Sequence, residues 1–263
     1  DISGAKILSL DLDEVAKTGG DAADRQTAVM YMLARYVAAK DYYLNIENLK
    51  HAPESYHLYH ESRAKEIRED KKRLVYDEFH RTSKAAAVRD QIVVDMREGR
   101  KWNVQVSLIS QSIDDFDKTM VEFATSIFIM DAGPEQAVQR TASVFGLGQT
   151  AQSALRNHVS GPSESGANIL CQFSTKSGNN TQLLTLTLGP IELWAFSTTV
   201  EDTTLRNLLY DRIGSKEARR VLAKLFPSGT AKKTIERLLN ESKETTGFID
   251  EQQQKDILRK MVS

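Results

Sequence analysis

The spacing of apolar and polar residues changes along the chain, and these changes predict an alternation of strands and helices. Residues 5–12 alternate apolar with polar side chains, which indicates a short strand that ends in an acidic loop. From 22 to 49 the apolar residues recur at helical spacing, so we expect a long helix there. Residues 54–70 are polar enough for an exposed helix or a loop. The apolar run at 74–79 predicts a second strand.

The same alternation continues through the middle of the chain. The predicted elements are a helix at 83–101, a strand at 104–112, a short helix at 115–123, a strand at 124–131, and helices at 134–145 and 149–158. This order of elements favours a mostly parallel sheet with helices on both sides. Residues 104–112 are nearly all apolar or small, which also suits a sheet that is covered on both faces.

The last third of the chain has a different texture. Turn-rich segments flank the apolar runs 168–173 and 183–188, which predicts a β-hairpin with its tip at KSGNN, residues 176–180. The run IELWAFSTT, residues 191–199, is expected to add one more strand. Helices are then predicted at 203–213, 216–225, 230–242 and 250–262. We therefore expect a main domain at 1–215 and a helical extension at 216–263.

Composition sets limits on this picture. The chain has 263 residues, of which 40% are hydrophobic and 27% charged, enough for one large α/β domain with a helical appendage. The formal net charge of −1 provides no overall basic field for nucleic acid. Cys171 is the single cysteine, and we expect a buried structural thiol in an apolar strand. We find no apolar run long enough for a membrane span. The start at Asp1, directly before a predicted strand, suggests a piece of a longer protein.

The stretch KRLVYDEFHR, residues 72–81, poses the main chemical question. Its apolar strand ends in Asp77 and Glu78, and burying two adjacent carboxylates costs several kcal/mol unless something compensates. Ligands of parallel α/β sheets bind at the carboxyl ends of strands. In P-loop NTPases a strand ends in an aspartate that helps hold Mg²⁺, and a following glutamate can activate water. The alternative is that Asp77 starts a turn and Glu78 caps the next helix.

A second group of polar residues surrounds the following strand. Arg97, Arg100 and Lys101 precede this strand, and Gln111 ends it. Adjacent parallel strands place Gln111 at the same sheet edge as Glu78, where a glutamine can hold a water or sense a γ-phosphate. We interpret Arg100 as an arginine finger that reaches the phosphate of a neighbouring subunit, and Lys101 as a nucleotide-binding residue. The alternative for the cations is stabilisation of a helix C-terminus by its dipole.

Three strings together resemble a known family. LVYDEFHR, REGRKWNVQVSLISQS and ATSIFIMDAG are similar to the ATPase half of VirB/TraC-class type IV secretion and conjugation ATPases, which are RecA-like motors of the HerA/FtsK superfamily. Within that class the Dot/Icm type IVB branch is the most similar, and the resemblance covers roughly residues 1–215. It implies that Asp77 and Glu78 are the Walker-B pair, with Asp77 at the metal. It also implies that Gln111 is the motif glutamine and that Arg100, with Arg97 as substitute, is the finger arginine.

The resemblance also implies cofactors, partners and a location. The implied cofactors are ATP and Mg²⁺. The implied partners are further copies of the same chain, which form a hexamer in this class, together with other secretion ATPases and inner-membrane components. The implied location is the cytoplasmic side of the bacterial inner membrane. The apolar stripes of the C-terminal helices would serve as a docking surface for a partner ATPase.

One departure from the family is large, because the phosphate-binding string G-x-x-x-x-G-K-[ST] is absent from the sequence. FGLGQTAQS and FPSGTAKKT are partial matches that we interpret as structural. The expected fold is thus a RecA-like P-loop NTPase sheet, mostly parallel, that lacks its P-loop segment. We expect the 263 residues alone to be inactive as an ATP hydrolase.

Two other functions remain open at this point. A DNA-translocating motor of the same superfamily would show strong, steeply salt-dependent DNA binding. A non-enzymatic docking module would neither bind DNA nor hydrolyse ATP. A zinc site is disfavoured, because one cysteine and scattered histidines such as His80 do not supply ligands at zinc spacing.

Overall fold

The chain is described by a computed structural model that covers residues 5–12, 14–15, 19–49, 51–131, 133–163 and 166–246. It divides into two compact units, the first made of 1–125 with 139–147 and the second of 126–138 with 148–263. The first unit contains a parallel sheet and the second an antiparallel one, so the chain is mixed α/β.

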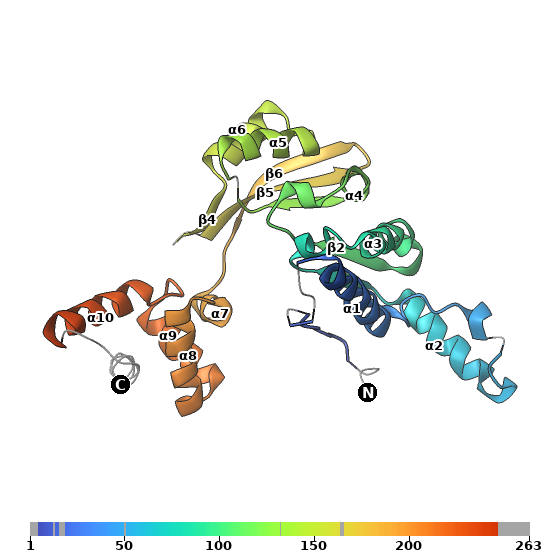
Figure 1. Cartoon of the computed structure of the whole chain (residues 1–263), viewed down its shortest axis with the longest axis horizontal. Coiled ribbons are helices and arrows are strands. Elements are labelled where there is room, and N and C mark those ends of the chain that lie inside the picture. The colour runs from blue at the N-terminus through green and yellow to red at the C-terminus, as the bar shows by residue number, and fades with distance from the viewer. Residues whose placement is uncertain are drawn as a thin grey trace. The chain divides into compact units, whose positions relative to one another are not determined.

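The first unit is built around two parallel strands. Its elements are α1 (Asp21–Ala39), η1 (Ile46–Leu49), η2 (Glu54–Tyr56), α2 (His57–Glu69), β1 (Lys72–Tyr76), η3 (Phe79–Thr82), α3 (Ala86–Glu98), η4 (Gly99–Trp102), β2 (Val104–Leu108), η5 (Ile113–Asp115) and α4 (Lys118–Phe123). Leu74 pairs with Val106 and Tyr76 with Leu108, so their side chains share one face of the sheet. Helix α3 packs on β2, and α1 packs on α3 (Figure 1). A core of Tyr31, Phe79, Val88, Ile92 and Met120 is buried among these elements.

The opposite face of the two-stranded sheet is open among the described residues. Val75 on this face is 55% exposed. Beside it, Arg73 donates hydrogen bonds of 3.0 and 2.7 Å from its Nε and terminal nitrogen to Gln105 Oε1. The expectation of a sheet covered on both faces is therefore wrong for the described chain, because the helices of this unit pack on one side.

A buried ion pair joins the two helices that cover the sheet. Asp95 on α3 is 1% exposed and accepts two hydrogen bonds from the Arg35 guanidinium of α1, one of them 2.7 Å from Nε to Oδ2. Tyr43 Oη donates to the same carboxylate at 3.0 Å and Gln91 Nε2 at 3.3 Å. Burial, and then the Asp95 charge, raise the pKa of Tyr43, and the same causes raise the pKa of Tyr76 to about 12. Asp95 is thus a buried charge that has an ion-pair partner and further hydrogen-bond donors, as a buried charge requires.

The second unit holds an antiparallel sheet followed by helices. Its elements are β3 (Ser126–Ile129), α6 (Gln149–Asn157), β4 (Ser160–Ser163), β5 (Gly166–Thr175), β6 (Gly178–Leu186), α7 (Pro190–Phe196), α8 (Val200–Ile213), α9 (Ser215–Leu225) and α10 (Lys232–Thr246), while α5 (Glu135–Phe145) belongs in part to each unit. Strand β5 pairs with β3, β4 and β6, all antiparallel. Helix α6 packs on β5 and β6 (Figure 1). The β5–β6 pair confirms the predicted hairpin.

Helices α7 to α10 share one core. Trp194 of α7 is fully buried, and its Nε1 donates to Phe226 O at 2.9 Å. Asp202 of α8 is also fully buried, and it accepts from Thr230 Oγ1 at 2.7 Å and from the Ala231 backbone at 2.8 Å, at the start of α10. Helices α9 and α10 of the expected extension therefore pack together with α7 and α8, rather than standing apart from them.

Several sequence-based expectations are wrong. Residues 5–12 form no strand, and Ile7 is 92% exposed, since no described strand pairs with this segment to satisfy its backbone. The run 191–199 begins as helix α7, because Pro190 occupies its first turn and Trp194 needs a buried site.

The remaining differences concern sheet direction and helix length. Strand β3 is antiparallel to β5, where Phe128 packs edge-on against Phe173, so the sheets are not mostly parallel. The long helix ends at Ala39, because Tyr42 and Tyr43 turn back to pack beside Trp102. The helix expected at 250–262 lies outside the described residues. Across the described ranges, none of the helices has the length and apolar character required to cross a bilayer.

We expect Asp95→Asn to destabilise the chain by roughly 3 kcal/mol, because it leaves the Arg35 charge without its partner in a largely buried site. The free energy of unfolding in urea measures this effect. Asp90→Asn is the matched control, since Asp90 is an exposed aspartate on the same helix and should change stability by less than about 0.5 kcal/mol. Equal stability of the two variants would contradict the role of the ion pair.

Candidate functional site

The acidic pair protrudes from the sheet because two backbone hydrogen bonds fix the residues on either side of it. Ile109, just beyond the end of β2, donates its N–H to Tyr76 O at 2.9 Å and accepts from Phe79 N at 2.8 Å. Asp77 and Glu78 lie between these two anchored positions and have no place in the ladder. The side chain of Phe79 is fully buried and stacks on Phe116 with ring centroids 5.8 Å apart. The two carboxylates therefore sit at the carboxyl end of the parallel strands.

The predicted contact between Glu78 and Gln111 is present. Gln111 Nε2 lies 3.2 Å from both carboxylate oxygens of Glu78 and donates to them. The parallel pairing of β1 and β2 brings these two residues to the same edge of the sheet. An amide that donates to a carboxylate fixes its orientation and leaves its other lone pairs available to water or a ligand.

Glu78 adopts a backbone conformation that is uncommon for a residue with a side chain. Its φ of 50° and ψ of 47° lie in the left-handed region, where non-glycine residues are disfavoured by about 1–2 kcal/mol. Arg81 N donates to Glu78 O at 2.9 Å and closes the turn that begins at this residue. Such strain persists where the surrounding structure enforces it, and it concentrates at functional sites.

The loop that carries Gln111 is held by hydrogen bonds on both sides of it. Ser110 Oγ donates to the Asp115 carboxylate, and Ser112 Oγ accepts from Asp114 N at 3.2 Å. Arg89 of α3 donates to Asp115 O at 2.8 Å. These contacts place the exposed Gln111 side chain without involving it, so the glutamine is free to serve Glu78.

Asp77 has the chemistry that Mg²⁺ requires. Its side chain is exposed, and Oδ1 accepts from Glu78 N at 2.9 Å. Mg²⁺ bound with a nucleotide usually takes one or two protein carboxylates, with phosphate oxygens and water completing the octahedron. Asp77 fits that role as a single oxygen donor. Within the described ranges, no cluster of three or more His, Cys, Asp or Glu side chains is arranged to hold a metal by itself.

Two residues at this site were not assigned to it from the sequence. His80 Nδ1 lies 3.1 Å from Glu78 Oε2. Tyr31 of α1 is 8% exposed; burial raises its pKa, the Arg81 charge lowers it, and the charges of Asp77 and Glu78 raise it further. The sequence gives no indication that Tyr31 lies near the acid pair, because Tyr31 is on a helix that is distant along the chain. His80 follows Glu78 by only two residues, and this spacing within a turn could have predicted that the two side chains lie close together.

The three cations predicted for the site lie at the amino ends of β1 and β2, away from the acid pair. Arg97, Arg100 and Lys101 precede β2, where Lys72 N donates to Asn103 O at 2.9 Å. The Arg97 guanidinium lies 5.4 Å from the ring centroid of Phe123, and Lys101 Nζ lies 5.4 Å from that of Trp102. The structure thus brings Gln111 to the acid pair within one chain and leaves the three cations at the opposite edge.

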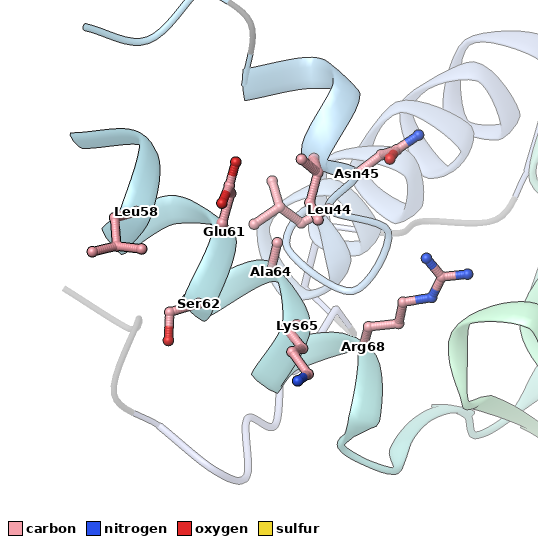
Figure 2. Close-up of a pocket in the computed structure, with 9 residues that line it drawn as sticks. Leu44, Asn45, Leu58, Glu61, Ser62, Ala64, Lys65 and Arg68 are labelled. Atoms are coloured by element: carbon pink, nitrogen blue, oxygen red, sulfur yellow. The ribbon is translucent and has the colours of Figure 1, made fainter. Parts of the chain in front are cut away.

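One hollow of the described chain lies elsewhere. A depression of about 420 Å³ lies between α2 and the segment after α1 (Figure 2). It is lined by Leu44, Asn45, Ile46, Leu58, Glu61, Ser62, Ala64, Lys65 and Arg68. None of the residues predicted for the site lines it. Its walls are mainly apolar and open, so we assign the chemistry to the acidic strand end, where the polar groups converge.

Comparisons with known proteins add no family assignment. No protein-family model matches the chain, and a search of curated proteins finds no match.

We expect Glu78→Gly to be more stable than Glu78→Ala by about 1 kcal/mol, because glycine adopts the left-handed conformation without a Cβ penalty. Urea unfolding of both variants measures the difference. At Asp90 within α3 the order should reverse, with Ala more stable than Gly by about 1 kcal/mol, as in any exposed helix interior. The same order at both positions would show that Glu78 is unstrained.

Proposed function

We propose that the chain is part of a type IV secretion ATPase and carries its magnesium-binding and water-activating acids. The observation that supports this proposal is the contact of Glu78 with Gln111 beside Asp77, at the carboxyl end of two parallel strands. Asp77, Glu78 and Gln111 provide two carboxylates and an amide, which are the groups that P-loop NTPases use to bind Mg²⁺ and to position water for hydrolysis. The sequence resemblance adds the class of motor, with DotO, also called IcmB, of the Dot/Icm system as the most similar member.

Each residue has a role that follows from its position. Asp77 would hold Mg²⁺, which neutralises charge on the phosphates of ATP when bound. Glu78, half-exposed at the rim, would take a proton from the attacking water. Gln111 would keep the Glu78 carboxylate oriented and sense the γ-phosphate.

The proposal requires a phosphate-binding loop that the 263 residues do not contain. The backbone amides and lysine of such a loop cradle the β- and γ-phosphates. We therefore assign ATP hydrolysis to the longer protein and expect the 263-residue chain to be inactive alone.

The cations fit the proposal only across a subunit interface. Arg100, Arg97 and Lys101 lie at the edge of the sheet opposite to Glu78, so they would serve the nucleotide of a neighbouring subunit. We propose a homo-oligomer, with a hexamer expected from the resemblance. Its other partners would be a second secretion ATPase and components at the cytoplasmic face of the inner membrane.

In a longer chain that includes the phosphate loop, we expect Glu78→Gln to abolish ATP hydrolysis while nucleotide binding is retained. The glutamine keeps the shape and the contact with Gln111 but is not a base. Phosphate release and fluorescent-nucleotide binding measure the two properties. Glu66→Gln, on the exposed surface of α2, is the control and should retain wild-type turnover. Wild-type turnover by Glu78→Gln would refute the assigned base.

Mixing two inactive variants tests the placement of Arg100. We expect Glu78→Gln and Arg100→Ala to be inactive separately, and their mixture to recover part of the activity, because some interfaces then combine an intact Glu78 with an intact Arg100. Steady-state ATPase rates over a range of mixing ratios measure this recovery. Arg73→Ala, which removes a cation bonded to Gln105 within the sheet, should stay active alone. A mixture without activity would place Arg100 outside the neighbouring site.

A further inference from the structure

His80 lies beside the proposed base, which Gln111 also contacts. Its Nδ1 lies 3.1 Å from Glu78 Oε2, at ion-pair distance but outside hydrogen-bond alignment. The Nδ1 atom is buried and makes no hydrogen bond in this arrangement, although the side chain as a whole is 43% exposed. A buried ring nitrogen without a partner costs about 1–3 kcal/mol. The acceptor nearest at hand is the Glu78 carboxylate.

The backbone keeps His80 in this position. Arg81 N donates to Glu78 O at 2.9 Å and Ser83 N to His80 O at 3.0 Å, so residues 78 to 83 form two successive turns. Phe79, between Glu78 and His80, is fully buried. On the same segment, the charges of Arg81, Asp77 and Glu78 act on Tyr31 of α1, so these groups lie near one another at this end of the sheet.

We propose that His80 is a positioning residue that donates its Nδ1–H to Glu78 and, together with Gln111, holds the carboxylate for water activation. The inference rests on the proposed function and extends it to a residue outside the acid, acid and amide set. Gln111 lies just after the end of β2, whereas His80 lies in the same turn as Glu78, so the base has one neighbour from each of the two strand ends. With two donors in place, the carboxylate keeps one orientation and presents its free lone pair to water.

The first experiment needs no ATP hydrolysis and uses the 263-residue chain. The ¹⁵N shifts of the His80 ring, followed to a pH at which they no longer change and the ring is neutral, report which nitrogen carries the proton. The signals are assigned by their loss in His80→Asn. We expect Nδ1–H in the wild type and in the control Glu66→Ala, and a change to Nε2–H in Glu78→Ala. Nε2–H in the wild type, or no change in Glu78→Ala, would overturn the proposal.

The second experiment uses the longer ATPase and separates positioning from packing. An asparagine amide nitrogen reaches about the place of Nδ1, so His80→Asn should keep most of the wild-type kcat. His80→Phe fills the space without a donor and should lower kcat at least about tenfold with little change in KM. His158→Phe, at the exposed end of α6, is the control.

The outcomes separate the proposed function from this inference. Wild-type kcat in His80→Phe, with the enzyme otherwise active, overturns the positioning role and leaves the function intact. An equal loss in the Asn and Phe variants also overturns it, because only the bulk of the ring would then matter. An inactive wild type refutes the proposed function and the catalytic part of this inference, while the ring-proton result still decides the contact between His80 and Glu78.

Discussion

The pairing of Ile109 with both Tyr76 and Phe79 is the constraint on which the site depends. Ile109 forms backbone hydrogen bonds with Tyr76 and with Phe79, which are three positions apart in the chain. Asp77 and Glu78, between them, therefore take no part in the hydrogen bonding of the two strands. Phe79 secures the far side of the excursion through its buried ring, over which the Arg89 guanidinium lies 5.1 Å from the centroid. The left-handed backbone of Glu78 follows from this geometry, since the chain has two residues in which to leave the strand and return.

Carboxylates in this chain occupy two contrasting environments. Asp95 and Asp202 are buried, and each accepts hydrogen bonds from several donors. Such donors offset the desolvation of a buried charge and couple helices to one another. Asp77 and Glu78 instead lie at the rim of the sheet, where water solvates them and few protein donors reach them. In this position the two carboxylates contribute little to the stability of the fold, and the left-handed backbone at Glu78 reduces it. Local strain of this kind is concentrated at functional sites.

The sequence predicted those features of the fold and the site that depend on local periodicity or on where strands end. Helix α6 and the β5–β6 hairpin followed from spacing and turn residues, and the meeting of Glu78 with Gln111 followed from the shared edge of parallel strands. Residues 5–12 alternate like a strand, yet strand formation depends on a partner that local pattern does not specify. The direction of β3 was equally non-local, because the edge of β5 decides it.

The distance between acids and cations gives the proposed function its geometry. A strand of five residues such as β2 spans about 13 Å, with Lys101 and Arg100 before its start and Gln111 beyond its end. A triphosphate bound at the acid pair therefore lies at the opposite end of the strands from the cations of the same chain. If the cations take part in hydrolysis, each subunit must present acids to one nucleotide and cations to another. That is a head-to-tail interface, and repetition of such an interface closes into a ring when its rotation allows.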